Sequence, residues 1–296
     1  HALSGWLRRV VTSLQCGRKR LALTTPQIMG VLNVTPDSFS DGGQLFADSK
    51  VHADRLLQRA ESMVVAGASI LDIGGESTRP GAAPVSSQEE LDRVMGAIDL
   101  IAAHVDVVLS VDISNPEVMS AAASAGAGLL NDVRAFRRDG ALQTAAATGL
   151  PVSLMHMSEE PDRMQSHTDY VDVVDDVSRF LEGRIAACIE AGINREQIVI
   201  DPGFGFGKTV SQNYEMLRRL AEFAAFELPI LVGLSRKSMI GAVTGRPANE
   251  RVVPSAVLAV IAAQNGASIV RVHDVAETAD ALGVWAAMNG ASLSAN

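Results

Sequence analysis

Two carboxylates, an amide and an ammonium group stand where short apolar runs of the sequence end. They belong to Asp112, Asn131, Asp201 and Lys237. Carboxylate oxygens accept paired hydrogen bonds from amidine-like edges, and amide and ammonium groups add further donors. Together the four would suit a flat heterocycle whose edge alternates N–H and C=O groups. Any one of them could instead cap a neighbouring loop or helix, so it is the convergence of all four that favours a binding site.

A second set of polar residues suits an anion. Arg271 and His273 alternate in the last apolar run, which places both side chains on the same side of a strand. With Asn33 and the loop 77–79 they would form a phosphate or pyrophosphate site. Mg²⁺ often takes only one or two protein ligands beside phosphate oxygens, and Asn33 or Asp41 could supply them.

The segment DPGFGFGKT, residues 201–209, has the glycines of a phosphate-binding loop but not their spacing. Pro202 occupies a position at which a P-loop needs a glycine, and proline has no N–H to offer a phosphate. The glycines would instead let the chain pass close to a pocket, with Phe206 either stacked on a flat ligand or packed in the core. His156, alone on its strand, is interpreted as structural. Ser235 is expected to begin a helix whose free N–H groups favour an anion, such as a substrate carboxylate.

Eight short apolar runs, each followed by a segment with helical spacing, repeat along the chain. They cover residues 27–34, 69–75, 107–113, 128–133, 151–157, 197–203, 229–235 and 268–275. Such runs alternating with helices indicate parallel strands buried on both faces. We predict a single α/β domain with the (β/α)8 TIM-barrel fold over residues 26–296, with a doubly wound open sheet as the alternative. In such a barrel the active site lies at the carboxyl ends of the strands, where the polar residues stand.

The composition excludes several classes of protein. With a net charge of −9 and 4% aromatic residues, the chain lacks the basic surface and stacking rings of a nucleic-acid-binding protein. No apolar run reaches the length that spans a membrane. Cys16 and Cys188 belong to no metal-binding or disulfide motif, which favours a reducing compartment.

Residues 1–25 hold five Lys or Arg and no acidic residue, so we expect a basic arm that is disordered or loosely attached, with a transit peptide as the less favoured interpretation.

Six segments resemble the motifs of dihydropteroate synthase, and they occur in the expected order. They are MGVLNVTPDSFSDGG (29–43), ILDIGGESTRPGA (70–82), LLNDV (129–133), DPGFGFGK (201–208), GLSRKSMIG (233–241) and RVHDV (271–275). The first two are long and specific, and the likeness covers almost everything after residue 26. At 111–116 the chain reads VDISNP where the family often has VDTSKP, so a lysine is missing there while Asp112 is retained.

The resemblance implies a (β/α)8 transferase of folate biosynthesis. Such an enzyme joins p-aminobenzoate to 6-hydroxymethyl-7,8-dihydropterin pyrophosphate, releases pyrophosphate with Mg²⁺ as cofactor, and is inhibited by sulfonamides. A homodimer is also implied by the resemblance, whereas a cytoplasmic location without nucleic-acid or membrane partners is expected from the composition. The expected reaction is an SN1-like substitution, in which the pterin ring carries positive charge as pyrophosphate leaves and loops exclude water. We expect the loops 39–43 and 78–81 to act as mobile lids.

The resemblance also implies roles for individual residues, and no nucleophilic side chain is among them. The residues expected to bind the pterin are Asp112, Asn131, Met155, Asp201, Phe206, Gly233 and Lys237. Those expected to bind pyrophosphate are Asn33, Thr78, Arg271 and His273, with Asn33 also on the metal. Those expected to bind p-aminobenzoate are Phe39, Thr78, Arg79, Pro80 and Ser238. The residues expected to act in catalysis are Asp41, Asp112, Lys237, Arg271 and His273.

Two other functions fit parts of the pattern. A pterin-dependent methyltransferase uses a similar barrel to pass a methyl group to a corrinoid protein, but it has no use for a pyrophosphate site at Arg271 and His273. A catalytically silent pterin-binding subunit is the alternative from another class. The presence together of Asn33, Asp112, Lys237 and Arg271 argues against it.

Overall fold

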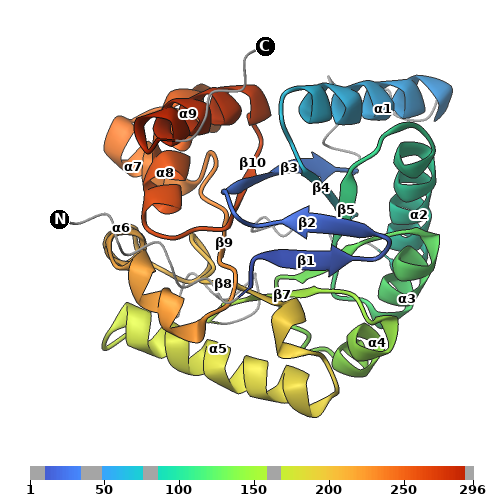
Figure 1. The fold of residues 1–296 in the computed structure, drawn as a ribbon, viewed down its shortest axis with the longest axis horizontal. Helices are drawn as coiled ribbons and strands as arrows, with labels where there is room; N and C mark the ends of the chain where they lie inside the picture. The colour runs from blue at the N-terminus through green and yellow to red at the C-terminus, as the bar shows by residue number, and fades with distance from the viewer. Residues whose placement is uncertain (1–10, 35–48, 76–85, 159–167, 291–296) are drawn as a thin grey trace.

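Eight parallel strands form the centre of the fold, as the sequence predicts (Figure 1). The computed structural model describes residues 11–34, 49–75, 86–158 and 168–290. The strands are β3 (Gln27–Asn33), β4 (Ile70–Gly74), β5 (Val108–Asp112), β6 (Leu129–Asp132), β7 (Val152–Met155), β8 (Ile198–Asp201), β9 (Leu231–Val232) and β10 (Ile269–Val272). Each lies inside one of the eight apolar runs, because a strand buried on both faces needs apolar residues throughout.

The sheet closes into a barrel, which excludes the open doubly wound sheet. Its strands are hydrogen-bonded in the order β8-β7-β6-β5-β4-β3-β10-β9. Its two end strands meet through a parallel bridge between Ile200 and Ile230, and the Ile200 N–H donates to the Pro229 carbonyl at 2.9 Å. Closure brings the carboxyl ends of all eight strands to one rim.

Helices surround the barrel, and local signals set their ends (Figure 1). Helix α2 begins after a capping box made by Ser86 and Glu89, and α3 begins with Pro116 and ends at Gly126, whose φ is 112°. The helices are α1 (Ser49–Val65), α2 (Ser87–His104), α3 (Pro116–Ala125), α4 (Ala141–Thr148), α5 (Val173–Glu190), α6 (Val210–Arg218), α7 (Ser238–Thr244), α8 (Val252–Gln264) and α9 (Val275–Met288). Among the described segments, no helix is long and apolar enough to cross a lipid bilayer.

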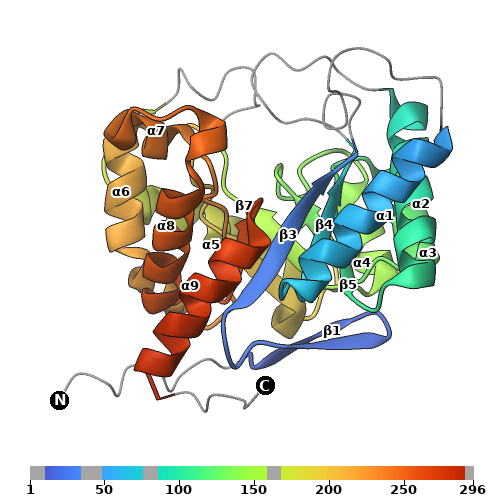
Figure 2. The same cartoon turned by 90° about the horizontal axis from the view of Figure 1, so that it is seen from above.

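An antiparallel hairpin lies under the amino ends of the barrel strands, opposite the site rim (Figure 2). Its strands are β1 (Ser13–Cys16) and β2 (Lys19–Ala22). Leu14, Cys16 and Leu21 are buried, and Lys19 contacts Asp106 and the Val107 carbonyl just before β5. The expectation of a disordered or loosely attached arm is therefore wrong for residues 11–25, because alternate apolar side chains attach this segment to the barrel floor. Residues 1–10 lie outside the described part of the chain.

Candidate active site

The predicted site residues that the structure describes gather at the carboxyl rim of the barrel. Strand register sets Asp112 beside Gly74 on one side and Asn131 on the other, and it pairs Met155 with Asp201. Asn33 stands at the end of β3, half-buried beside Gly74. The predicted residues Phe39, Asp41, Thr78, Arg79 and Pro80, and both predicted lids, lie outside the described residues.

Arg271 is held between two carboxylates. Its Nε donates to Asp72 Oδ2 at 2.6 Å, and its Nη2 donates to Asp112 Oδ2 at 3.0 Å. Burial alone would lower the pKa of Arg271, but the attraction of both carboxylates outweighs it and the pKa is raised. The sequence assigned Asp112 and Arg271 to separate pterin and pyrophosphate groups, whereas the structure brings them into direct contact.

Asp72, which sequence analysis did not single out, is the centre of this cluster. Its side chain is fully buried, and besides Arg271 it accepts from Ser110 Oγ at 2.5 Å and Asn131 Nδ2 at 3.2 Å. Aspartate is rarely buried without partners, so its position inside the apolar run Ile70–Gly74 was the signal that could have found it. Its partners come from three other strands and are distant in sequence.

Lys237 and Asp201 form the part of the rim next to Arg271, because β9 pairs with β10 and meets β8 through the closing bridge. The Lys237 ammonium donates to the Phe204 carbonyl and lies 4.7 Å from the centroid of the Phe206 ring, a cation–π distance. Burial lowers the pKa of Lys237 to about 8, although the attraction of Asp201 opposes it. Burial likewise raises the pKa of Asp201, against the attraction of Lys237 and a 2.7 Å hydrogen bond from the Gly203 N–H. A Cβ at Gly233 would lie 3.8 Å from both Lys237 Nζ and Arg271 Cβ, so a side chain there would contact both residues.

Lys208, which sequence analysis also did not single out, holds the glycine loop through hydrogen bonds to its backbone. Its buried ammonium donates to the carbonyls of Gly203 at 2.8 Å and Phe206 at 3.1 Å, and contacts His156 Nδ1 at 2.9 Å. Burial lowers the pKa of Lys208 to about 7. Burial and then repulsion by Lys208 lower the pKa of His156 to about 2, so its Nδ1 accepts as part of a neutral ring. His156 also packs edge-on against Phe180, with ring centroids 4.9 Å apart, which agrees with its structural interpretation.

The glycines of the 201–209 segment serve close approach. Gly203, Gly205 and Gly207 have φ values of 72°, 81° and 63°, in the left-handed region that favours glycine. A Cβ at Gly203 would lie 1.8 Å from the His156 carbonyl oxygen, closer than any real contact. The loop places Phe206 against Val133, Met155 and Met157, a small apolar cluster separate from the main core. This cluster provides one apolar wall suited to a flat ring.

Ser235 departs from its predicted role as a helix cap. Helix α7 begins only at Ser238, with Lys237 as its N-cap residue. Ser235 Oγ instead lies 3.0 Å from His273 Nδ1 and accepts from the His273 N–H at 3.1 Å. Arg236, between Ser235 and Lys237 in the turn, has a φ of 59°. Its guanidinium pairs with Asp274, and its Nε donates to Asp274 Oδ2 at 2.9 Å. The turn that carries Lys237 is therefore tied to the strand end that carries His273.

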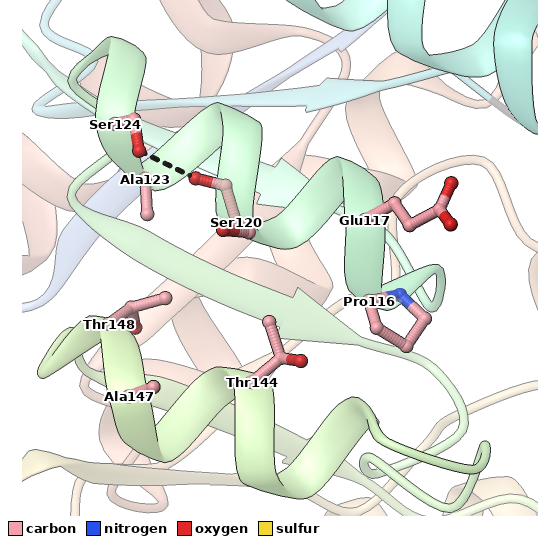
Figure 3. A pocket seen from close by; sticks show the side chains of 8 residues that line it. All are labelled: Pro116, Glu117, Ser120, Ala123, Ser124, Thr144, Ala147 and Thr148. Carbon is pink, nitrogen blue, oxygen red and sulfur yellow. Dashed lines mark hydrogen bonds between the residues drawn. The ribbon is translucent and has the colours of Figure 1, made fainter.

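A groove lies between two of the helices that surround the barrel (Figure 3). It runs between α3 and α4 and includes Glu117, Ser120, Ser124, Thr144 and Thr148 in its lining. Ser124 Oγ donates to the backbone carbonyl of Ser120 at 2.9 Å within the helix. None of the predicted site residues lines the groove, so we place the chemistry at the barrel rim.

Comparisons with known proteins agree with the fold and identify a family. Residues 29–273 match the family described as pterin binding enzyme. The chain is 50% identical over 274 residues to dihydropteroate synthase of Haemophilus influenzae, covering 93% of this chain and 98% of that protein. A crystal structure of Yersinia pestis dihydropteroate synthase with a sulfonamide drug complex is 50% identical, with a TM-score of 0.88 over 94% of this chain and all of the other. Xanthomonas albilineans dihydropteroate synthase with 4-aminobenzoic acid is 45% identical, with a TM-score of 0.88 over 95% and 100% of the chains.

The fold, the polar rim and these matches define a pterin-binding enzyme built on a (β/α)8 barrel. Within that class the chain belongs to the dihydropteroate synthase family, whose members are transferases.

Proposed function

We propose that this protein joins p-aminobenzoate to 6-hydroxymethyl-7,8-dihydropterin pyrophosphate, forming 7,8-dihydropteroate for folate biosynthesis and releasing pyrophosphate. The observation that carries the proposal is one rim that holds three carboxylates, an amide, an ammonium and a guanidinium around an apolar wall. Relatives of closely similar fold bind a sulfonamide drug and 4-aminobenzoic acid, which supports sulfonamides as inhibitors of this protein too.

The pterin would lie between the charged rim and the Met155–Phe206 wall. Asp112, Asn131 and Asp201 offer acceptors and an amide to the alternating ring edge. Lys237 donates from the side of Gly233, where the missing side chain leaves room for the ring. With a pKa of about 8, Lys237 is mostly protonated at neutral pH and is a hydrogen-bond donor.

The pyrophosphate would bind beside Arg271 and His273, with Thr78 from the undescribed loop. No group of three His, Cys, Asp or Glu residues lies together among the described residues, so no protein cage for a metal occurs in that part of the chain. A single oxygen ligand from Asn33 beside pyrophosphate oxygens fits the way Mg²⁺ is bound by phosphate-transferring enzymes. Mg²⁺ bound there would neutralise charge on the leaving group.

The reaction would be a dissociative, SN1-like substitution. The bond from the pterin methylene to the pyrophosphate oxygen breaks with its electron pair on pyrophosphate, and the ring delocalises the positive charge. The amine of p-aminobenzoate then forms the C–N bond and loses a proton. Arg271 and His273 stabilise the leaving anion, and Asp112 stabilises the cation, with Lys237 orienting the ring. Asp41 is proposed to help Asp112, and Phe39, Arg79, Pro80 and Ser238 to hold p-aminobenzoate.

The deciding experiment measures pyrophosphate release with p-aminobenzoate, the pterin pyrophosphate and Mg²⁺. Release must require the amine and no corrinoid partner; a corrinoid requirement would favour a methyltransferase. Lys237→Ala should weaken binding of 6-hydroxymethylpterin about tenfold or more, and Arg271→Ala should chiefly weaken binding of inorganic pyrophosphate. Asp132→Asn is the matched control, since this buried carboxylate bonds Ser114 and two backbone N–H groups near the rim without contacting either cation.

The homodimer expected from the sequence has support in α8. Val253, Val257 and Ile261 recur every fourth residue on this helix and are 73%, 52% and 37% exposed. Such an apolar stripe is typical of an interface. Val257→Glu should shift the mass measured by light scattering from that of a dimer to that of a monomer. Val171→Glu is the control: this valine is fully exposed and lies outside α8, so its substitution should leave the mass unchanged. A cytoplasmic location is also proposed, in keeping with two buried free thiols at Cys16 and Cys188.

A further inference from the structure

Asp72 connects side chains from both halves of the site. It accepts from Asn131, a residue proposed to bind the pterin, and from Arg271, a residue proposed to bind pyrophosphate. Ser110 supplies a third donor. A fully buried carboxylate with several charge-assisted or polar hydrogen bonds is rigidly held, because losing any partner leaves a charge poorly compensated.

Arg271 is anchored unequally by its two carboxylates. Its Nε bond to Asp72 is 2.6 Å long and the acceptor side chain is fully buried. Its Nη2 bond to Asp112 is 3.0 Å long and the acceptor side chain is 14% exposed. A guanidinium is a planar fork of five donors, so fixing Nε fixes the plane while the Nη groups can still change acceptor. The weaker contact is therefore the one that a ligand at the rim can replace.

An exchange at Asp112 would keep every buried charge compensated. When the pterin edge donates to Asp112, that carboxylate gains hydrogen bonds in place of Nη2. When pyrophosphate approaches Arg271, Nη2 gains an anionic acceptor in place of Asp112. Neither group has to be left unpaired, which would otherwise be costly in a partly buried site.

We propose that Asp72 is a positioning residue that couples the two halves of the site: it holds Asn131 and Arg271 on one carboxylate while Arg271 exchanges Asp112 for the pyrophosphate of the substrate. The inference rests on the proposed function for the identity of the two ligands. It makes pterin and pyrophosphate binding mutually favourable, because each ligand releases the group that the other needs.

The test measures binding by calorimetry and needs no turnover. Inorganic pyrophosphate with Mg²⁺ is titrated into the protein with and without saturating 6-hydroxymethylpterin. The wild type should bind pyrophosphate about fivefold or more tightly when the pterin is present, and Asp72→Asn should reduce this coupling to within about twofold of none. Asp132→Asn, which removes a different buried carboxylate, should lower the unfolding midpoint and keep the coupling.

A double-mutant cycle separates positioning from general damage. If Asp72 acts through Arg271, Arg271→Lys should remove the coupling by itself, and Asp72→Asn should add less than about twofold to that variant's loss of pyrophosphate affinity. Arg271→Lys also keeps the proposal testable if Asp72→Asn does not fold. Coupling that survives in Arg271→Lys, additive losses in the cycle, or wild-type ligands that bind independently would each overturn the proposal. A wild type that shows coupling without amine-dependent pyrophosphate release would instead refute the proposed reaction.

Discussion

Two charged clusters lie side by side at the rim, with Gly233 next to Lys237 of one and Arg271 of the other, and they differ in composition. The arginine cluster contains one cation, Arg271, and two carboxylates, Asp72 and Asp112, all on strands. The lysine cluster contains two cations, Lys208 and Lys237, and one carboxylate, Asp201; both lysines lie in the loops after β8 and β9. Backbone carbonyls supply much of the hydrogen bonding to these lysines.

The difference predicts which half of the site responds to pH. Excess carboxylate raises the pKa of Arg271, so its guanidinium keeps its charge at every physiological pH. Burial with too few carboxylates lowers the pKa of Lys237 to about 8 and of Lys208 to about 7, so the lysine cluster titrates near neutrality. The cation that stays charged therefore lies on a strand, whereas the two lysines with lowered pKa values lie in loops and depend on how the loop backbone is held.

The largest expected effect comes from breaking the loop of the lysine cluster at Gly203. Gly203→Ala places a Cβ 1.8 Å from the His156 carbonyl oxygen at a φ of 72°, so the backbone must move. We expect a loss of about 3 kcal/mol or more in the free energy of unfolding measured in urea, together with loss of pterin binding. Gly149→Ala is the control, because its φ is 68° but a Cβ there meets nothing within 4 Å, and it should cost about 1 kcal/mol. Equal losses in the two variants would show that the loop is not tightly held.

Much of the barrel could be predicted from sequence because its strands are defined locally. Apolar runs alternating with segments of helical spacing gave all eight strand positions, and the polar residues at their ends gave most of the described members of the rim. The hairpin was missed because Arg18, Lys19 and Arg20 hid the alternation of Leu14, Cys16 and Leu21, with Gly17 in the turn at a φ of 62°. The basic residues suggested a disordered arm, but the alternation of apolar and polar residues, with a period of two, is the pattern of a β-strand.

The two residues missed at the site show what local patterns cannot supply. Asp72 lies within an apolar strand, and Lys208 follows glycines that fail as a phosphate loop. The function of each depends on partners far along the chain, such as Arg271 for Asp72 and His156 for Lys208. Which strand ends meet is settled only when the barrel closes, so the pairings needed the structure.

A second, smaller effect separates the lysines by pH. Both pKa values in the folded protein are below the unfolded value of about 10.5, so unfolding takes up protons and stability should rise with pH, from about pH 7 for Lys208 and from about pH 8 for Lys237. Each lysine raises the free energy of unfolding by at most about 1.4 kcal/mol per pH unit. Because Lys237 is half-buried, solvent screening reduces its contribution. Above about pH 9 the two cysteines oppose this rise in stability, because burial raises the pKa of Cys16 to about 12 and of Cys188 to about 11. Their thiols lose protons more readily in the unfolded chain than in the folded protein.

Lys208→Met is the variant that tests this assignment. The free energy of unfolding is measured in urea at steps of half a pH unit. In this variant it should no longer rise between pH 7 and 8, but it should keep the rise that begins near pH 8. Arg179→Met, at an exposed arginine paired on α5, is a control that should leave both parts unchanged. A Lys208→Met protein with the wild-type slope between pH 7 and 8 would place the titrating group elsewhere.

The smallest expected effect comes from trimming the arginine cluster rather than breaking it. Ser110→Ala removes the 2.5 Å hydrogen bond to Asp72 and leaves the bonds from Asn131 and Arg271. A hydrogen bond to a charged group contributes about 1.5 to 3 kcal/mol, and the remaining partners should reduce the observed loss to about 1 kcal/mol. Because Arg271 keeps both carboxylates, the coupling between pterin and pyrophosphate should not change. A shift in that coupling would mean that Ser110 orients Asp72, and that three donors rather than two set the position of the guanidinium.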